Sequence, residues 1–176
     1  VVLKGWPQVS VAEHKQKSKE SAGCFVVTVS DTRDETTDQS GQLIKELLAE
    51  KGQRLAGYRI VKDEPVQIEA LLQEALDKKD VDVVIVNGGT GISPRDGTYE
   101  VVSRLLEKRL DGFGEIFRLL SYQDIGSAAI MSRAVAGSAK GKVLISLPGS
   151  KGAVDLAMQR LVLPELGHMV SQLQGR

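Results

Sequence analysis

The chain has 176 residues, the size of one ordinary domain, which leaves little room for two independent hydrophobic cores. Hydrophobic residues make up 41% of it and charged residues 26%, so the composition argues against a fibrous, a largely disordered or a membrane-spanning protein. The 23 basic and 23 acidic residues cancel at pH 7, so no overall charge draws the chain to nucleic acid or to an anionic membrane, and neither is an expected partner.

Cysteine and histidine are scarce. Cys24 is the only cysteine, so no intrachain disulfide can form, and His14 and His168 are too few for a Cys/His zinc site within one chain. The first residues lack the apolar core of a signal peptide, and no apolar run approaches the roughly 20 residues of a spanning helix. We therefore expect a soluble protein of the reducing cytoplasm.

Residues 1–22 mix lysines with glutamates and have no sustained helical or strand periodicity. We predict an N-terminal arm over 1–22 and a single domain over 23–176. The arm is either a frayed terminus or a segment that drapes over a neighbouring subunit, with Trp6 as its anchor.

From residue 24 onward, short β-branched runs alternate with amphipathic stretches. Gly52 supplies a helix stop, and Pro65 and Thr98 each suit the start of a helix. Pro164 either kinks the last helix or opens a second one. The predicted elements, in chain order, are a strand over 24–30, a helix over 41–51, a strand over 54–61, a helix over 66–79, a strand over 81–86, helices over 99–110 and 113–124, a strand over 142–147 and a last helix from about residue 152.

This alternation predicts an α/β fold of three layers, with a doubly wound, mostly parallel sheet and helices on both faces. The run over 81–86 is apolar without alternation beyond Asp82, which is typical of a strand covered on both faces. We expect it at the centre of the sheet.

Small polar and acidic residues follow each of the four predicted strands, and in a doubly wound sheet ligands bind outside the carboxyl ends of the strands. If the sheet forms as predicted, all four segments share one rim. They are Ser30-Asp31-Thr32, Lys62-Asp63-Glu64, Asn87-Gly88-Gly89-Thr90-Gly91 and Pro148-Gly149-Ser150.

The turn over 88–91 lets backbone approach a ligand closely and offers N–H donors to a phosphate. It matches neither the dinucleotide fingerprint G-x-G-x-x-G nor a P-loop, and a tight strand-to-loop connection is an equally good interpretation. The segment 136–143 resembles a P-loop superficially, but Ala136 and Val143 occupy two of its defining positions and a strand follows it. We reject it as a phosphate loop.

Asp63 and Asp96 are the carboxylates best placed to hold Mg²⁺ against a phosphate in that turn, because Mg²⁺ commonly takes one or two carboxylates plus substrate phosphates. Phosphoryl or nucleotidyl transfer needs no nucleophile from the protein. Two simpler interpretations stay open: Asp63 as a helix-entry residue, and Asp96 as a partner of Arg95 or a support of the next helix start.

At this point the residues resemble a known family. The motif NGGTGISPRDGTYE is similar to the signature of the MoaB/Mog molybdenum cofactor biosynthesis proteins. The resemblance extends in order through TVSDTRDETTDQSGQLI, IVKDEP, GFGEIFRLLSYQDIGSAAIMSRAVAG and LISLPGSKGAV, over roughly residues 24–165. The short loop between Asp31 and Asp38 and the stretch FGEIFRLLSYQDIG resemble the MoaB branch in particular.

The resemblance implies a molybdopterin-binding fold whose active members adenylylate molybdopterin with Mg-ATP and release pyrophosphate. It implies catalytic and metal-binding roles for Asp63 and Asp96, and an oligomer of three or six subunits. Gly114 and Glu115 match a further motif of the family. The substrate-binding positions that the resemblance implies are Asp31, Asp38, Ser40, Gly88, Gly89, Thr90, Gly91, Ser132, Arg133, Pro148, Gly149 and Ser150.

The chain departs from the family pattern at two positions: Asn87 replaces the usual threonine before the glycines, and Tyr99 replaces the usual proline. The main alternative function is a noncatalytic molybdopterin carrier or scaffold of the same pathway. A flavodoxin-like flavin module is disfavoured, because the loop after the first strand is acidic and aromatic residues make up only 4% of the chain.

Overall fold

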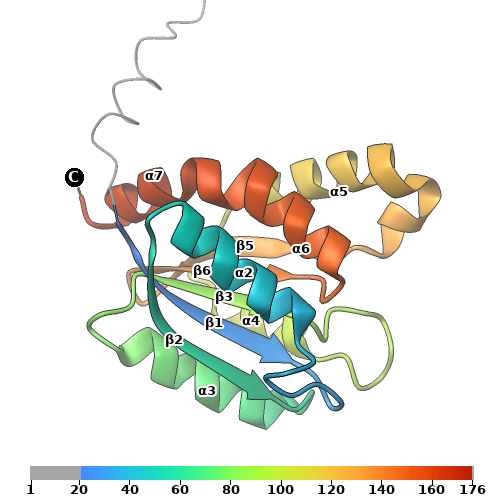
Figure 1. Cartoon of the computed structure of the whole chain (residues 1–176), viewed down its shortest axis with the longest axis horizontal. Coiled ribbons are helices and arrows are strands. Elements are labelled where there is room, and N and C mark those ends of the chain that lie inside the picture. Colours follow the sequence, from blue (N-terminus) through green and yellow to red (C-terminus); the bar gives the residue numbers. More distant parts are fainter. Residues whose placement is uncertain (1–20, 176) are drawn as a thin grey trace, which may run out of the picture.

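The computed structural model of the chain describes residues 21–175 (Figure 1). Six strands form one sheet in the order β2-β1-β3-β6-β5-β4. In chain order the elements are β1 (Gly23–Val29), α2 (Gln39–Glu50), β2 (Arg54–Val61), α3 (Pro65–Asp77), β3 (Val83–Asn87), α4 (Thr98–Leu105), β4 (Lys108–Arg109), α5 (Asp111–Ile125), the 3-10 helix η1 (Gly126–Met131), β5 (Val135–Ala139), β6 (Lys142–Leu147), α6 (Lys151–Ala157), the π-helix η2 (Met158–Val162) and α7 (Leu163–Leu173).

The sheet is mixed. Strands β2, β1, β3 and β6 run parallel, whereas β5 pairs antiparallel with β6 and β4 antiparallel with β5. Strand β3 lies between β1 and β6 and all five of its residues are buried, so the prediction that this strand sits at the sheet centre is confirmed. The predicted α/β fold with a mostly parallel sheet is confirmed as well.

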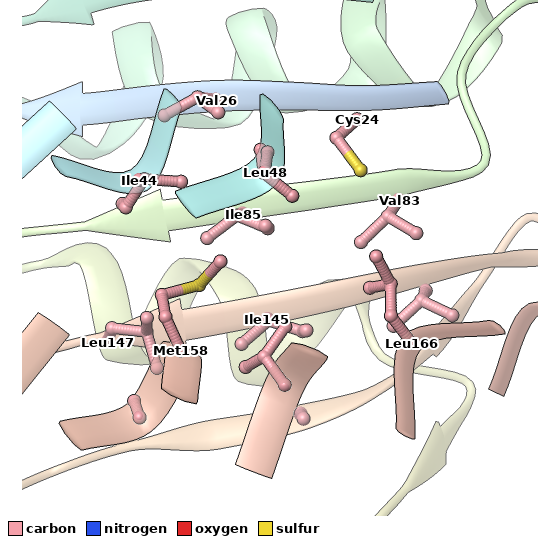
Figure 2. Packing of buried hydrophobic residues seen from close by; sticks show 14 of the residues in the cluster. Cys24, Val26, Ile44, Leu48, Val83, Ile85, Ile145, Leu147, Met158 and Leu166 are labelled. Carbon is pink, nitrogen blue, oxygen red and sulfur yellow. The ribbon is translucent and has the colours of Figure 1, made fainter. Parts of the chain in front are cut away.

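Helices cover both faces of the sheet, with α2, α6 and α7 on one side and α3 on the other (Figure 1). Residues of the central strands alternate between the two cores: Ile85 packs on the α2 side and Val84 on the α3 side. Figure 2 shows the first core, in which Ile44 of α2 and Leu166 of α7 surround Ile85 and neighbouring strand residues. Cys24 is buried in this same core as a small apolar side chain.

The predicted helix over 99–110 is wrong in its second half. Helix α4 ends at Leu105, and Lys108–Arg109 form the edge strand β4. The Glu107 N–H donates to Ser138 O at 2.8 Å and the Leu110 N–H to Ala136 O at 2.8 Å. Hydrogen bonds to a strand distant along the chain therefore replace those that would have continued the helix.

The segment that superficially resembled a P-loop is a β-hairpin. Strand β5, which the sequence analysis did not predict, pairs with β6 through a two-residue turn in which Lys140 and Gly141 have φ values of +49° and +71°. Two successive residues at positive φ define the turn type whose twist matches that of the flanking strands. The rejection of a phosphate loop at this segment agrees with this structure.

Pro164 opens a second helix, which was one of its two interpretations. It lies in the first turn of α7, and the π-helix Met158–Val162 directly precedes that turn. The wider π turn accommodates a residue that lacks an N–H and crowds the preceding turn. None of the helices within 21–175 has the length and apolarity needed to cross a membrane.

The predicted N-terminal arm lies outside the described residues except for Ser21 and Ala22. Ala22 is fully buried in the first core, and its N–H donates to Gln53 Oε1 at 2.8 Å. The division of the chain into an arm and one domain stays a prediction.

Candidate functional site

The four parallel strands end at one edge of the sheet, and the segments that follow them lie side by side. The Ser30 N–H donates to Val61 O at 2.9 Å, which joins the ends of β1 and β2. The Gly88 N–H donates to Leu147 O at 3.1 Å, which joins the ends of β3 and β6. We call this edge the rim: the loops after β1, β2, β3 and β6.

The glycine turn sits in the middle of the rim. Gly88 and Gly89 have φ values of +97° and +62°, a conformation that side chains with a Cβ rarely adopt. A Cβ on Gly88 would lie 2.2 Å from Val29 O, and the Cα of Gly88 is 2.9 Å from the position of a Cβ on Gly149. Backbone alone therefore fills the space between the ends of β1 and β6.

Three carbonyl groups of the turn accept hydrogen bonds. Gly89 O accepts from the Thr98 N–H at 3.0 Å, Thr90 O accepts from Arg133 Nε at 2.8 Å, and Gly91 O accepts from Arg133 Nη2. Among the described residues, no acceptor pairs with the N–H groups of Thr90, Gly91 or Ile92. Such a run of free N–H groups is suited to bind an anion.

Asp63 and Asp96 flank this turn from two sides. A Cβ on Gly89 would lie 2.6 Å from Asp63 Oδ2, and a Cβ on Gly91 would lie 2.6 Å from Asp96 Oδ2. Asp63 Oδ1 accepts from the Gly97 N–H at 3.2 Å, and Asp96 Oδ2 accepts from the Ser93 N–H at 2.9 Å. Folding thus brings the two carboxylates, distant along the chain, to the same backbone segment.

The rim concentrates negative charge around Asp63. Burial raises the pKa of its carboxyl, and the nearby charges of Asp96 and Asp31 raise it further, against the opposing effects of the Gly97 N–H and of Arg95. A bound cation would relieve this repulsion. Mg²⁺ commonly takes one or two carboxylates together with substrate phosphates, and Asp63 and Asp96 beside the glycine turn fit such a donor set. Within 21–175, no group of three or more His, Cys, Asp and Glu residues could hold a metal ion.

Two of the simpler interpretations of these aspartates do not match the structure. The N-cap of α3 is Glu64, whose side chain makes no capping hydrogen bond, so Asp63 is not the cap of this helix. Arg95 pairs with Asp31 at 3.1 Å and with Glu64 at 3.2 Å, whereas Asp96 bonds backbone instead. Arg95 is a rim residue that we did not predict, although it stands next to Asp96 in the motif.

Asp38 is turned into the protein. It is 2% exposed, caps α2 through the Gly41 N–H at 3.0 Å, and accepts the hydroxyls of Thr28 and Tyr58 at 2.5 and 2.7 Å. Burial alone would raise its pKa, but these hydrogen bonds and the charge of Arg33 outweigh burial and lower it. Its carboxylate oxygens are occupied by these internal bonds, which argue against the predicted direct contact with a substrate.

The same hydrogen-bond network holds the side chain of Asn87 in place. Its Nδ2 donates to Thr28 Oγ1 at 2.9 Å, so the polar chain Asp38–Thr28–Asn87 ends directly before the glycine turn. Asn87 is fully buried, and its side-chain oxygen has no hydrogen-bond partner in the described structure.

Ser40 and Gly149 connect the loops after β1 and β6. Ser40 Oγ donates to Gly149 O at 2.8 Å, and Arg33 Nη1 donates to the same oxygen at 3.2 Å. Arg33 was missed by the sequence analysis, yet it is the one basic residue of the acidic loop 31–38. Ser150 caps α6 by accepting from the Ala153 N–H at 3.3 Å, and Pro148 precedes this pair half-buried.

The remaining predicted residues come from α5 and from the segment that follows η1. Arg133 reaches the glycine turn with its guanidinium, and Ser132 precedes Arg133 at the end of η1. Gly114 and Glu115 lie on α5, where they line a surface cavity of about 250 Å³ together with Tyr99. The structure therefore does not place Gly114 and Glu115 among the rim loops.

Comparison with known proteins identifies the class to which this fold and rim belong. Residues 25–168 match the family model described as "Probable molybdopterin binding domain". The chain belongs to this family of MoaB/Mog molybdenum cofactor biosynthesis proteins, as the motif resemblance predicted.

Within the family, the chain is similar to molybdenum cofactor biosynthesis protein B. The protein of that name from Bacillus cereus is 53% identical over 166 residues, which cover 94% of this chain and 98% of that protein. The one from Bacillus subtilis is 50% identical over 167 residues, again covering 94% and 98%. These matches make the chain a molybdenum cofactor biosynthesis protein with a molybdopterin-binding domain.

Solved structures agree. A crystal structure of molybdenum cofactor biosynthesis protein B aligns with a TM-score of 0.87 at 53% identity, covering 89% of this chain and 98% of that one. The tungsten cofactor synthesizing protein MoaB from Pyrococcus furiosus aligns with a TM-score of 0.80 at 36% identity, covering 89% and 99%. The three-layer fold is therefore the fold of these relatives.

Proposed function

We propose that this protein binds molybdopterin on the rim and adenylylates it with ATP, releasing pyrophosphate. The observation that carries the proposal is the convergence of two carboxylates and a row of free N–H groups on one turn. Within residues 21–175 no acceptor pairs with the N–H groups of Thr90, Gly91 and Ile92, and Asp63 and Asp96 flank the same segment.

Each part of the rim has a role in this reaction. The N–H row binds a phosphate group, as runs of backbone donors do in other phosphate sites. Asp63 and Asp96 are the residues that would hold Mg²⁺ at this turn. When bound, this ion neutralises charge that develops on the transferred group. The attacking group belongs to the pterin substrate, so the protein positions reactants and supplies no nucleophile.

The direct test is to incubate the protein with Mg-ATP and molybdopterin and to measure pyrophosphate and adenylylated pterin. We expect both products in equal amounts. Bound pterin with neither product would contradict the proposal and would favour the noncatalytic carrier.

Replacing the two carboxylates separates catalysis from binding. We expect Asp63→Asn and Asp96→Asn each to slow pyrophosphate release by at least about 100-fold, the usual cost of removing one charge-stabilising group. Molybdopterin affinity should change by less than about threefold, because the N–H row remains. The matched control is Asp80→Asn, at the opposite edge of the sheet and 61% exposed. Equal losses of activity and pterin affinity would assign the carboxylates to site integrity instead.

We also infer that the protein is a homo-oligomer of three or six subunits. Support comes from a line of exposed apolar side chains on α5 and η1, which a monomer would leave in water. They are Ile116, Leu119, Tyr122, Ile125, Ile130 and Met131, which are 48–78% exposed.

A further inference from the structure

We infer that Arg133 and Tyr99 are positioning residues that aim the N–H groups of the glycine turn at the bound anion. The inference rests on the proposed function, because it concerns the same anion site. It assigns Arg133 a role different from the direct substrate contact that the motif resemblance implied.

The first step is the geometry of the peptide bond. In a trans peptide the C=O and the following N–H point in opposite directions. The described residues contain no cis peptide. Arg133 Nε and Nη2 hold the carbonyl oxygens of Thr90 and Gly91, so the N–H groups of Gly91 and Ile92 point away from the guanidinium. The Thr98 N–H fixes the Gly89 carbonyl in the same manner and thereby orients the Thr90 N–H.

The second step is that Arg133 is itself held in place. Its guanidinium forms an ion pair with Glu100, and its side chain is only 24% exposed. The Arg133 hydrogen bond, against a smaller effect of burial, lowers the pKa of Glu100, so this partner stays ionised. Two carbonyls and a carboxylate occupy the planar donor fork, which an ammonium group does not reproduce. Arg133 therefore acts on the anion through the turn rather than by contact.

The third step is the ring of Tyr99, which stands where the family usually has proline. The guanidinium carbon of Arg133 lies 4.8 Å from the centre of this ring, within the range of a cation–π contact. The Tyr99 hydroxyl accepts a hydrogen bond from Arg109 Nη2 at 3.3 Å. Because Arg109 belongs to the edge strand β4, the ring is anchored to the sheet. A continuous series of contacts thus runs from β4 through Tyr99 and Arg133 to the glycine turn.

The test uses the full chain labelled with 15N and 13C and titrated with inorganic pyrophosphate. In the wild type we expect the largest amide shifts at Gly91 and Ile92. Arg133→Met should weaken pyrophosphate binding by about tenfold or more, the usual loss when a supporting residue of a binding site is removed. Arg104→Met is the matched control, because Arg104 of α4 is exposed and pairs at 3.0 Å with Glu69 of α3 instead of with the glycine turn. It should bind within about twofold of the wild type.

A pair of variants at position 99 tests the ring. Tyr99→Leu should weaken pyrophosphate binding by about threefold, and Tyr99→Phe should restore most of the loss by returning the aromatic face. If the thermal transition of Arg133→Met shows that it does not fold, the two Tyr99 variants test the positioning role without it. Wild-type affinity in both Arg133→Met and Tyr99→Leu would overturn the positioning role.

The carbonyl 13C shifts of Thr90 and Gly91 in the ligand-free protein separate the two proposals. They should move in Arg133→Met and not in Arg104→Met, whether or not any anion binds. Unmoved carbonyl shifts overturn the positioning role alone. If the carbonyl shifts move in Arg133→Met but the wild type binds neither pyrophosphate nor molybdopterin, the positioning role stands and the proposed function is overturned.

Discussion

At the scale of single residues, Asp63 combines functional placement with an energetic cost. Burial and the charges of Asp96 and Asp31 make its ionisation less favourable than in the unfolded chain. Functional sites often contain a carboxylate whose ionised form is unfavourable in the free protein, because a bound ligand stabilises that form. Asp38, at the start of α2, is the opposite case, since internal hydrogen bonds stabilise its charge.

The raised pKa of Asp63 predicts a pH-dependent gain of stability in Asp63→Asn. Between the ordinary value of 3.8 and the raised pKa, the folded state binds more protons than the unfolded state, so the free energy of unfolding falls as pH rises. Asparagine removes this loss. At pH 7 we therefore expect Asp63→Asn to melt at a higher temperature than the wild type.

Thermal melts of wild type, Asp63→Asn and the control Asp80→Asn from pH 3 to pH 8 check this prediction. The advantage of Asp63→Asn should vanish below pH 3.8, where the carboxyl is protonated in both states. A lower melting temperature than the wild type at pH 7 would contradict it.

At the scale of elements, the sequence predicts a helix or strand well where that segment has one buried, apolar face. The helix α3 begins at Pro65 and buries Ile68 and Leu72, as the periodicity indicated. Strand β5 consists of small residues, and β4 is the charged pair Lys108–Arg109. Neither has a periodic pattern, because their conformation depends on pairing with β6 and with each other.

The hairpin between β5 and β6 predicts opposite effects of alanine at two glycines. A Cβ would meet nothing within 4 Å at either Gly141 or Gly152, but only Gly141 has a positive φ, of +71°. We expect Gly141→Ala to destabilise the fold by about 1–2 kcal/mol. Gly152→Ala, in the first turn of α6, should be neutral or stabilise by up to about 1 kcal/mol. Urea unfolding of both variants measures the difference, and equal midpoints would refute the assigned turn.

At the scale of the whole molecule, the surface formed by α5 and η1 is distinguished by its exposed apolar side chains. Leu119 and Ile130 are 58% and 78% exposed, and neighbours at helical spacing extend the line. Val66 is 81% exposed too, but it lies on α3 across the sheet. Isolated exposed residues of that kind are ordinary, whereas a contiguous line is typical of an interface.

We therefore predict that Leu119→Glu disrupts the oligomer and that Val66→Glu does not. A charge buried in an apolar interface costs far more than a charge on a free surface. Light scattering after size-exclusion chromatography should give a trimer or hexamer for wild type and for Val66→Glu, and smaller species for Leu119→Glu. A monomeric wild type would show that the line of apolar residues has another role.

The sequence by itself determined the order of most elements and the identity of the rim. Periodic apolar positions report which face of a segment is buried, and parallel strands necessarily end at one edge, so Asp31, Asp63 and Gly88 could be placed together before any coordinates were known. The tertiary structure alone decided where their neighbours point: Asp38 inward, Arg133 onto carbonyls, Arg95 onto Asp31. Hydrogen-bond partners distant in the chain leave no local periodicity, because packing and not pattern brings them together.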